Sequence, residues 1–209
     1  AAKNTDEKIR MHSSSGGVFS ILAEQTIKQG GVVFGARFDE NWEVKHDYTE
    51  TIDGVSVFRG SKYVQSKTGD TFKQAEQFLK QNRKVLFSGT PCQIVALKRY
   101  LKKEYENLLL VDFICHGVPS PGVWRKYLKQ VIALTCDKNT VSSHLKLLLS
   151  ERNALVEGIS FRDKRLGWQK YSFSLTLSTT DESGNKNTVS LSESLNENLF
   201  MRGFLANLY

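Results

Sequence analysis

A near-continuous apolar run, NLLLVDFIC at residues 107–115, does most to narrow the possible folds of this 209-residue chain. Strands buried on both faces of a parallel sheet have this composition, whereas half-exposed strands alternate apolar and polar residues. Strand-forming segments at residues 32–38 and 84–87 come before it, separated by helical patterns. The alternation of strand and helix predicts an α/β fold with a mostly parallel sheet flanked by helices.

Helical patterns are marked by apolar residues at a spacing of three and four. One follows Ser13–Ser15, whose hydroxyls can cap a helix, and ends at Gly30-Gly31. Another follows Thr71, a second candidate N-cap, and two more cover residues 92–105 and 120–134. These helices would cover the sheet.

The character of the chain changes after about Cys136, where it becomes rich in β-forming residues. YSFSLTLS at 171–178 alternates with period two and DESGNK at 181–186 is a turn, so a hairpin is expected. A final helix is expected within 194–209. We expect residues 1–12 to be a disordered or linker start and residues 13–136 to be the α/β core. Residues 137–209 would be a β-rich extension plus terminal helix, packed on the same domain.

The formal net charge of +7 is spread along the chain, with a denser block at residues 161–170. An excess of this size is typical of a solvated surface, and we expect no nucleic-acid partner. An anionic small molecule, such as a nucleotide or flavin phosphate, explains the charge equally well. The basic block itself is interpreted as a solvated hairpin edge, with an anion clamp or pairing with another protomer as the alternatives.

Three cysteines, Cys92, Cys115 and Cys136, form no CxxC pair and no cluster with metal-ligand spacing. The chain alone therefore predicts no metal site, and the cysteines indicate a reducing, cytoplasmic setting. No apolar run approaches the length of a membrane span, and the polar start has no signal-peptide core. Because an initiator Met is also missing, we expect a fragment of a longer protein.

Three segments are candidate cofactor-binding loops. Ser14, Ser15, Gly16 and Gly17 open a helix, where free N–H groups favour an anion, although an ordinary capped helix is the alternative. Ser61, Lys62 and Tyr63 can contact a phosphate or stack on a ring, or they form a surface turn. Cys115 and His116 follow a strand; adjacent side chains on extended backbone point apart, so a cofactor-pocket wall is favoured over a nucleophile–base pair.

The fourth segment is Gly89-Thr90-Pro91-Cys92, at the carboxyl end of a predicted strand, where ligands bind in open α/β sheets. Thr90 can cap the following helix, and Pro91 can occupy its first position. Cys92 would then lie near a helix N-terminus, which lowers a thiol pKa. The equal alternative is a small buried residue at a tight turn. Cys92 and His116 are the two candidates for a catalytic role.

Five stretches together resemble the coenzyme F420 hydrogenase/dehydrogenase beta-subunit family, in particular its bacterial branch, often found near polysaccharide-biosynthesis genes. The likeness runs from about Ser13 to Tyr209. The stretches are SSSGGVFSILAE, GSKYVQS, SGTPCQIVALKRYL, VDFICHGVPSPGVW and ISFRDKRLGWQKYSF.

The resemblance implies a flavin-dependent oxidoreductase that binds FAD and passes electrons or hydride between iron–sulfur clusters, flavin and a second carrier. That carrier is coenzyme F420 in methanogens, and an electron-donor protein or coenzyme is the implied partner. The serine–glycine loop, the segment beginning at Gly60 and the loop at Gly89–Cys92 match the family's motifs and look like parts of a flavin pocket.

The sequence departs from the family because the cysteine-rich segments that bind clusters are not in it. Clusters are therefore expected only in the full-length protein, since two cysteines cannot supply a four-thiolate site. Rival readings are a non-catalytic binding or assembly domain, or a sugar-nucleotide-binding transferase in polysaccharide biosynthesis; both predict no flavin. The apolar C-terminal end favours self-association into a homo-oligomer.

Overall fold

The computed structural model describes residues 2–137, 155–165, 167, 170–180 and 186–206. The chain forms two compact units, Ala1–Val118 and Pro119–Tyr209. This division differs from the expected boundary near Cys136, because the whole helix Pro121–Asp137 belongs to the second unit. Within that unit, the helix buries Trp124 and Tyr127 in an aromatic cluster.

Sheet A of the first unit has the strand order β2-β1-β3-β4. β1 pairs in parallel with β3, and β3 with β4, while β2 is an antiparallel edge strand. The mostly parallel α/β fold predicted from the sequence is therefore confirmed. The strands are β1 (Val32–Phe38), β2 (Val44–Thr49), β3 (Val85–Ser88) and β4 (Leu108–Val111).

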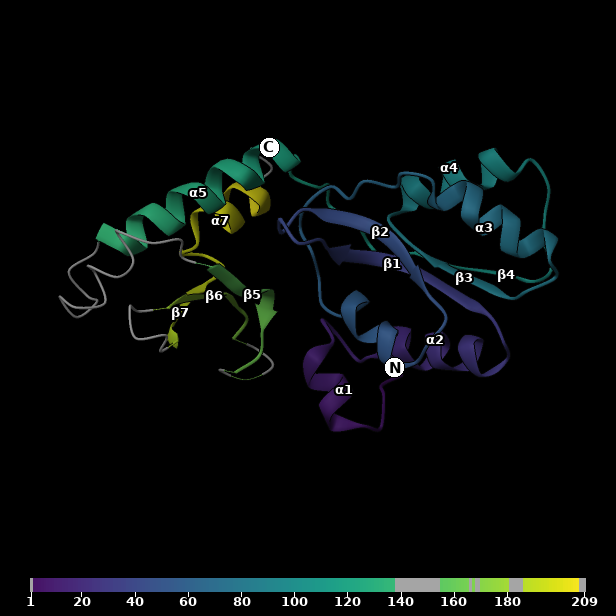
Figure 1. The fold of residues 1–209 in the computed structure, drawn as a ribbon, viewed down its shortest axis with the longest axis horizontal. Helices are drawn as coiled ribbons and strands as arrows, with labels where there is room; N and C mark the ends of the chain where they lie inside the picture. Colours follow the sequence, from purple (N-terminus) through teal and green to yellow (C-terminus); the bar gives the residue numbers. More distant parts are fainter. Residues whose placement is uncertain (1, 138–154, 166, 168–169, 181–185, 207–209) are drawn as a thin grey trace. The chain divides into compact units, whose positions relative to one another are not determined.

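Helices lie on both faces of sheet A (Figure 1). On one face are α3 (Thr71–Lys80) and α4 (Pro91–Leu101), and on the other are α2 (Val18–Lys28) and the short 3-10 helix η1 (Asp53–Phe58). This covering explains why β3 is apolar on both sides. Val85 and Phe87 face α3 and α4, whereas Leu86 joins the cluster on the α2 side.

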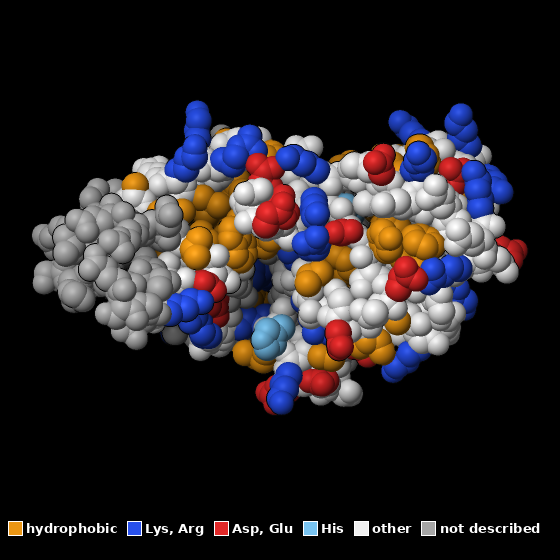
Figure 2. Space-filling model, viewed as in Figure 1, with side chains coloured by type: hydrophobic (Ala, Val, Ile, Leu, Met, Phe, Trp, Pro, Cys, Tyr) orange, Lys and Arg blue, Asp and Glu red, His pale blue; other side chains and the backbone are white. Residues whose placement is uncertain are grey.

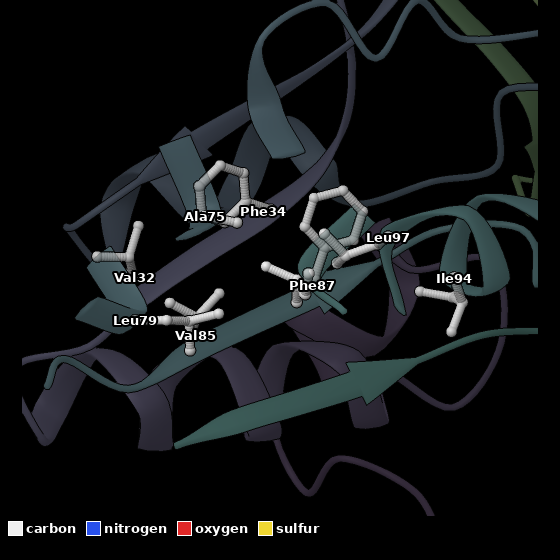
Figure 3. Close-up of a cluster of buried hydrophobic side chains, with 9 residues drawn as sticks. Val32, Phe34, Ala75, Leu79, Val85, Phe87, Ile94 and Leu97 are labelled. Carbon is white, nitrogen blue, oxygen red and sulfur yellow. The ribbon is translucent and has the colours of Figure 1, made fainter. Parts of the chain in front are cut away.

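The larger core cluster lies between β1, β3, α3 and α4, as Figure 3 shows. Phe34 and Phe87 stack with ring centroids 5.4 Å apart, and both are completely buried. Burying a side chain of this size contributes about 1.5–3 kcal/mol, so this cluster holds the two helices against the sheet. Its members are Val32, Phe34, Ala75, Leu79, Val85, Phe87, Ile94, Leu97 and Leu101.

A tight glycine turn joins α2 directly to β1. Gly30 has a φ of 75°, in the left-handed region that favours glycine. A Cβ atom on Gly31 would lie 2.7 Å from the backbone oxygens of Thr26 and Lys84, so a side chain there would push α2 away from the sheet. Because the C-terminus of α2 meets the start of β1, the N-terminus of α2 lies toward the carboxyl ends of the parallel strands.

The start of the chain is ordered rather than the expected disordered or linker segment. Helix α1 (Glu7–His12) begins after Asp6, whose side chain accepts a hydrogen bond from Ile9 N. Asn4 is buried, and its backbone N–H donates to Gly16 O at 2.7 Å. Residues 2–6 are thereby fastened to the serine–glycine loop.

The second unit contains a three-stranded antiparallel sheet of order β5-β6-β7. The predicted hairpin is confirmed by the pairing of β6 with β7, and residues 181–185 of its turn lie outside the described residues. The expected terminal helix is shorter than predicted, because Asn198 caps it and fixes its start. The elements are α5 (Pro121–Asp137), β5 (Leu155–Asp163), β6 (Ser172–Thr180), β7 (Lys186–Ser194) and α7 (Leu199–Leu205).

Five aromatic side chains form the core of this unit. Trp124 is fully buried, and its ring centroid lies 5.0 Å from Phe200 and 5.1 Å from Phe161. Tyr127 and Phe173 complete the cluster. Across the described ranges, no helix combines the length and the apolar character that crossing a membrane requires.

Candidate functional site at the carboxyl edge of sheet A

The topology of the first unit gathers the predicted loops at one edge of sheet A. Gly89–Cys92 and Cys115–His116 follow β3 and β4, so both segments leave the carboxyl ends of parallel strands. Ser14–Gly17 precedes α2, whose N-terminus points to the same edge. In open α/β sheets this is where ligands bind.

A glycine, not a serine, occupies the N-cap position of α2. This residue is Gly17, with a φ of 77°, and it has no side chain with which to cap the helix. The predicted serine cap is therefore wrong: Ser13 instead ends α1, and its hydroxyl donates to Ile9 O at 2.7 Å. The N-terminus of a helix carries amide donors and a positive dipole end that favour an anion.

A hydrogen bond between two hydroxyls joins this loop to the segment that begins at Gly60. Ser61 Oγ lies 2.6 Å from Ser14 Oγ. Arg59, which the sequence analysis missed, strengthens the contact: its Nε donates to Ser20 Oγ at 3.0 Å, and its guanidinium lies 4.0 Å from Glu24. Two loops 47 residues apart in sequence thus meet at the start of α2.

Lys62 is partly buried and donates to two backbone oxygens, Arg59 O at 2.9 Å and Gly60 O at 3.2 Å. Burial lowers its pKa from 10.5 to about 7, because desolvation penalises the charged amine. Near neutral pH this amine can therefore gain or lose a proton in response to a nearby charge. Tyr63 beside it is half-buried.

The Gly89–Cys92 loop begins α4 as predicted, with Thr90 at the N-cap and Pro91 at the first helical position. Its backbone donors, however, are used within the protein. Gly89 N–H donates to Val111 O at 3.1 Å, and Thr90 N–H donates to Gln93 Oε1 at 3.0 Å. Since proline has no N–H, these three residues offer no free amide to an anion.

Gly89 is glycine because protein side chains occupy the space beside it. A Cβ atom at this position would lie 3.0 Å from Gln93 Oε1 and 3.5 Å from His46 Nε2. Cys92, by contrast, is exposed, which excludes the alternative of a buried core residue. Its Sγ lies 3.1 Å from Thr90 Oγ1.

Cys115 and His116 do not form a hydrogen-bonded pair in the described structure. Cys115 Sγ accepts a hydrogen bond from Gly117 N at 3.4 Å, and His116 is exposed. The predicted strand stops at Val111, and the two apolar residues beyond it, Phe113 and Ile114, are 55% and 89% exposed. The geometry does not favour a nucleophile–base dyad, and a role in a pocket wall stays a prediction.

Sequence reasoning missed a buried histidine that contacts this loop. His46 on β2 is 5% exposed; its Nε2 lies 3.0 Å from Ser88 O and its Nδ1 lies 2.9 Å from Ser66 Oγ. Gln93 Nε2 donates to Ser66 Oγ at 2.9 Å. The Thr-x-x-Gln spacing of Thr90 and Gln93 is a readable helix-start signal, whereas nothing local marks His46.

Two further observations limit the chemistry of the site. Among the described side chains there is no group of three or more His, Cys, Asp or Glu that could hold a metal ion. The side chain of Cys136 is not one of the described side chains. A surface pocket lies along residues 3–9 and 21–29, and none of the predicted site residues line it. Figure 2 shows lysine and arginine side chains spread over the drawn face with acidic side chains between them.

Comparison with known proteins gives two positive findings. Residues 82–142 match a family model that describes the C terminus of the coenzyme F420 hydrogenase/dehydrogenase beta subunit. No curated protein matches the chain. Among solved structures, the fold is similar to a chain of the xenon-derivatised F420-reducing NiFe hydrogenase complex from Methanosarcina barkeri, with 18% identity and a TM-score of 0.51.

That similarity covers 90% of this chain and 58% of the matched chain, so the present chain spans a little over half the length of its structural relative. The family match contains β3, the Gly89–Cys92 loop, β4 and the Cys115–His116 segment. Residues 82–142 are thus similar to the C terminus of that beta subunit, and the structural match shows a shared fold.

Proposed function

We propose that this chain is the FAD-binding domain of an iron–sulfur flavoprotein oxidoreductase, with the flavin nucleotide held at the carboxyl edge of sheet A. The observation that carries the proposal is the 2.6 Å contact between Ser14 and Ser61 just before α2, whose N-cap is Gly17. It brings two family-like motifs together at the kind of helix terminus that binds phosphate groups.

The residues at this terminus fit the phosphate portion of a dinucleotide. The first-turn amides of α2 and the hydroxyl of Ser14, which accepts from Ser61 and keeps its own hydrogen, are hydrogen-bond donors suited to phosphate oxygens. Arg59 and Lys62 contribute positive charge, because Arg59 remains charged and an approaching anion favours the protonated form of Lys62. Gly16 and Gly17 instead let the start of the chain pack on this loop, since a Cβ would lie 2.9 Å from Ala2 O at Gly16 and 3.1 Å from the Asn4 Cβ at Gly17.

The Gly89–Cys92 loop fits a different part of the ligand. Since the amides of Gly89 and Thr90 are already bonded within the protein, this loop would offer a neutral wall instead of a phosphate cradle. Exposed Pro91 and Cys92 would contact the flavin ring or its edge, with Cys115 and His116 on the neighbouring strand end. The flavin itself would supply the electron- or hydride-transferring centre.

The described residues do not fit an iron–sulfur cluster, because Cys92 and Cys115 supply two of the four thiolates that such a cluster needs. We therefore assign this chain no cluster-binding step. Clusters, an electron-donor protein or coenzyme, and a second carrier such as coenzyme F420 would belong to the longer protein and its complex. Homo-oligomerisation and a cytoplasmic location also remain predictions.

A titration of the purified 209-residue chain with FAD tests the proposal. We expect a stoichiometric complex that retains the visible flavin absorbance after gel filtration. Replacing both Ser14 and Ser61 by Ala removes the Ser14 donor and the Ser61 hydroxyl that orients it, and should weaken FAD binding about tenfold or more. Ser56→Ala, on the exposed surface of η1, is the matched control and should bind FAD normally.

Three outcomes would contradict the proposal. A native chain that stays colourless with excess FAD favours a non-catalytic assembly domain. A chain that takes up a sugar nucleotide and no FAD favours a transferase. FAD binding unaffected by the double serine variant would show that the nucleotide lies elsewhere on the chain.

A further inference from the structure

The hydrogen bonds around His46 have one consistent direction. Ser88 O can only accept, so Nε2 of His46 carries the hydrogen and Nδ1 of the neutral ring accepts from the Ser66 hydroxyl. The Ser66 oxygen then accepts from the Gln93 amide nitrogen, which leaves Gln93 Oε1 to accept Thr90 N–H. Each group in this series of hydrogen bonds uses its donor and acceptor without conflict.

The surroundings of the ring favour this neutral form. His46 stacks on Phe87 with ring centroids 5.4 Å apart and an interplanar angle of 9°. The groups described in contact with the ring, from Phe87, Ser88, Ser66 and Gly89, carry no charge. Burial lowers the pKa of His46, which opposes protonation of Nδ1.

We infer that His46 is a positioning residue for the Gly89–Cys92 loop. It bonds directly to Ser88 O, and it reaches Thr90 through Ser66 and Gln93. These bonds fix the backbone that orients exposed Cys92. The segment at residues 59–70 takes part because Ser66 links β2 to α4, while its other end bonds to Ser14 through Ser61. The two halves of the proposed flavin site are thus connected through one segment. Only this last consequence rests on the proposed function.

Two substitutions of His46 separate hydrogen bonding from packing. His46→Phe keeps a ring against Phe87 and removes both hydrogen bonds, whereas His46→Gln supplies one donor and one acceptor. Ser66→Ala interrupts the series of hydrogen bonds at a half-buried position. This variant replaces His46→Phe in the test if His46→Phe does not fold. Val44→Ala, a buried change on the same strand, is the control for general loss of stability.

The measurement is the ratio of two amide hydrogen-exchange rates in the 209-residue chain, the rate of Thr90 divided by that of the core residue Leu86. We expect His46→Phe and Ser66→Ala to raise this ratio about tenfold, since one to two net hydrogen bonds are lost locally. His46→Gln should return the ratio to near the native value, and Val44→Ala should leave it unchanged. An unchanged ratio in His46→Phe and Ser66→Ala, or no restoration by His46→Gln, would overturn the inference.

FAD binding by the same variants separates this inference from the proposed function. If the native chain binds FAD, His46→Phe should weaken binding and His46→Gln should restore it; equal affinity in all three would contradict the link to the flavin site. If the native chain binds no FAD, the proposed function fails, and the exchange ratio still decides the role of His46.

Discussion

At the scale of single residues, the candidate site combines polar groups whose protonation depends on burial. Lys62 and His46 lie in the two halves of the site, and burial lowers the pKa of both. Neither is paired with a carboxylate in the described contacts, so desolvation is the principal cause in each case. Both residues should therefore make the stability of the first unit depend on pH, in windows that do not overlap.

Lys62 should lower stability at neutral pH and cease to do so in alkali. Below a pH of about 7 the amine is charged in both states, and the folded chain bears the cost of burying it. Between about 7 and 10.5 the unfolded chain binds more protons, so stability rises with pH. Relative to Lys62→Met, the unfolding free energy of the native chain should gain up to about 1.4 kcal/mol per pH unit in this window.

Urea denaturation of the two proteins at several pH values between neutrality and mild alkali measures the difference directly. Parallel stability curves would mean that the folded and unfolded states hold the Lys62 proton equally tightly.

His46 should affect the stability of the first unit at acid pH. Because its pKa is lowered from 6.5 in the folded chain, the unfolded chain takes up a proton first as the pH falls. Stability should therefore decline below pH 6.5 by at most about 1.4 kcal/mol per pH unit. His46→Gln has no such proton, so its unfolding free energy should fall less steeply. Thermal unfolding of both proteins between neutral and mildly acid pH measures the slopes, and equal slopes would contradict the assignment.

At the scale of elements, the helix starts differ in how much local sequence specifies them. Thr90, Pro91 and Gln93 all mark the start of α4, and the structure begins that helix at Pro91. Gly17 begins α2 with no capping side chain, so the nearby serines misled the prediction. Helix α7 is a third case, because its cap is also a buried tertiary contact.

Asn198 should be a large contributor to the stability of the second unit. It is fully buried, its Oδ1 accepts from Met201 N at 3.0 Å, and its Nδ2 donates to Tyr127 Oη at 2.6 Å and to Glu193 at 2.8 Å. Asn198→Ala removes the cap and leaves buried partners unsatisfied, so it should cost about 2–4 kcal/mol.

Chemical denaturation followed by tryptophan fluorescence checks this value, since Trp124 lies in the core of the same unit. Asn196→Ala, at an exposed position two residues earlier, should change stability by less than about 0.5 kcal/mol. Similar effects of the two substitutions would show that the contacts of Asn198 are energetically minor.

At the scale of the whole molecule, the net charge of +7 acts on any anionic ligand. If the nucleotide phosphates of FAD bind at the start of α2, salt should weaken the complex because it screens this attraction. Riboflavin has the same ring and no phosphate, so its weaker binding should respond little to salt. Titrations at low and high ionic strength measure both affinities, and an equal salt response would argue against a phosphate subsite.

The sequence by itself determined the sheet and which of the predicted loops follow its strands. Apolar runs buried on both faces, such as residues 85–87, require helices on both sides, so the order of strands and helices predicted an α/β fold. The same expectation is wrong for the run at 107–115, because β4 is an edge strand of sheet A and Leu109 is 44% exposed. Motif spacing likewise placed Gly89–Cys92 and Cys115–His116 after strands. These inferences succeeded because periodicity and glycine–proline punctuation act over a few residues.

Only the tertiary structure decided what those loops contact. The bond between Ser14 and Ser61, and the approach of His46 to Ser88, join residues more than 40 positions apart, and no local pattern encodes such distances. It also showed that the amides of Gly89 and Thr90 are already bonded, which the motif alone could not reveal. Hydrogen-bond partners depend on which segments the folded chain brings together, whereas strand and helix formation depends largely on neighbours in sequence.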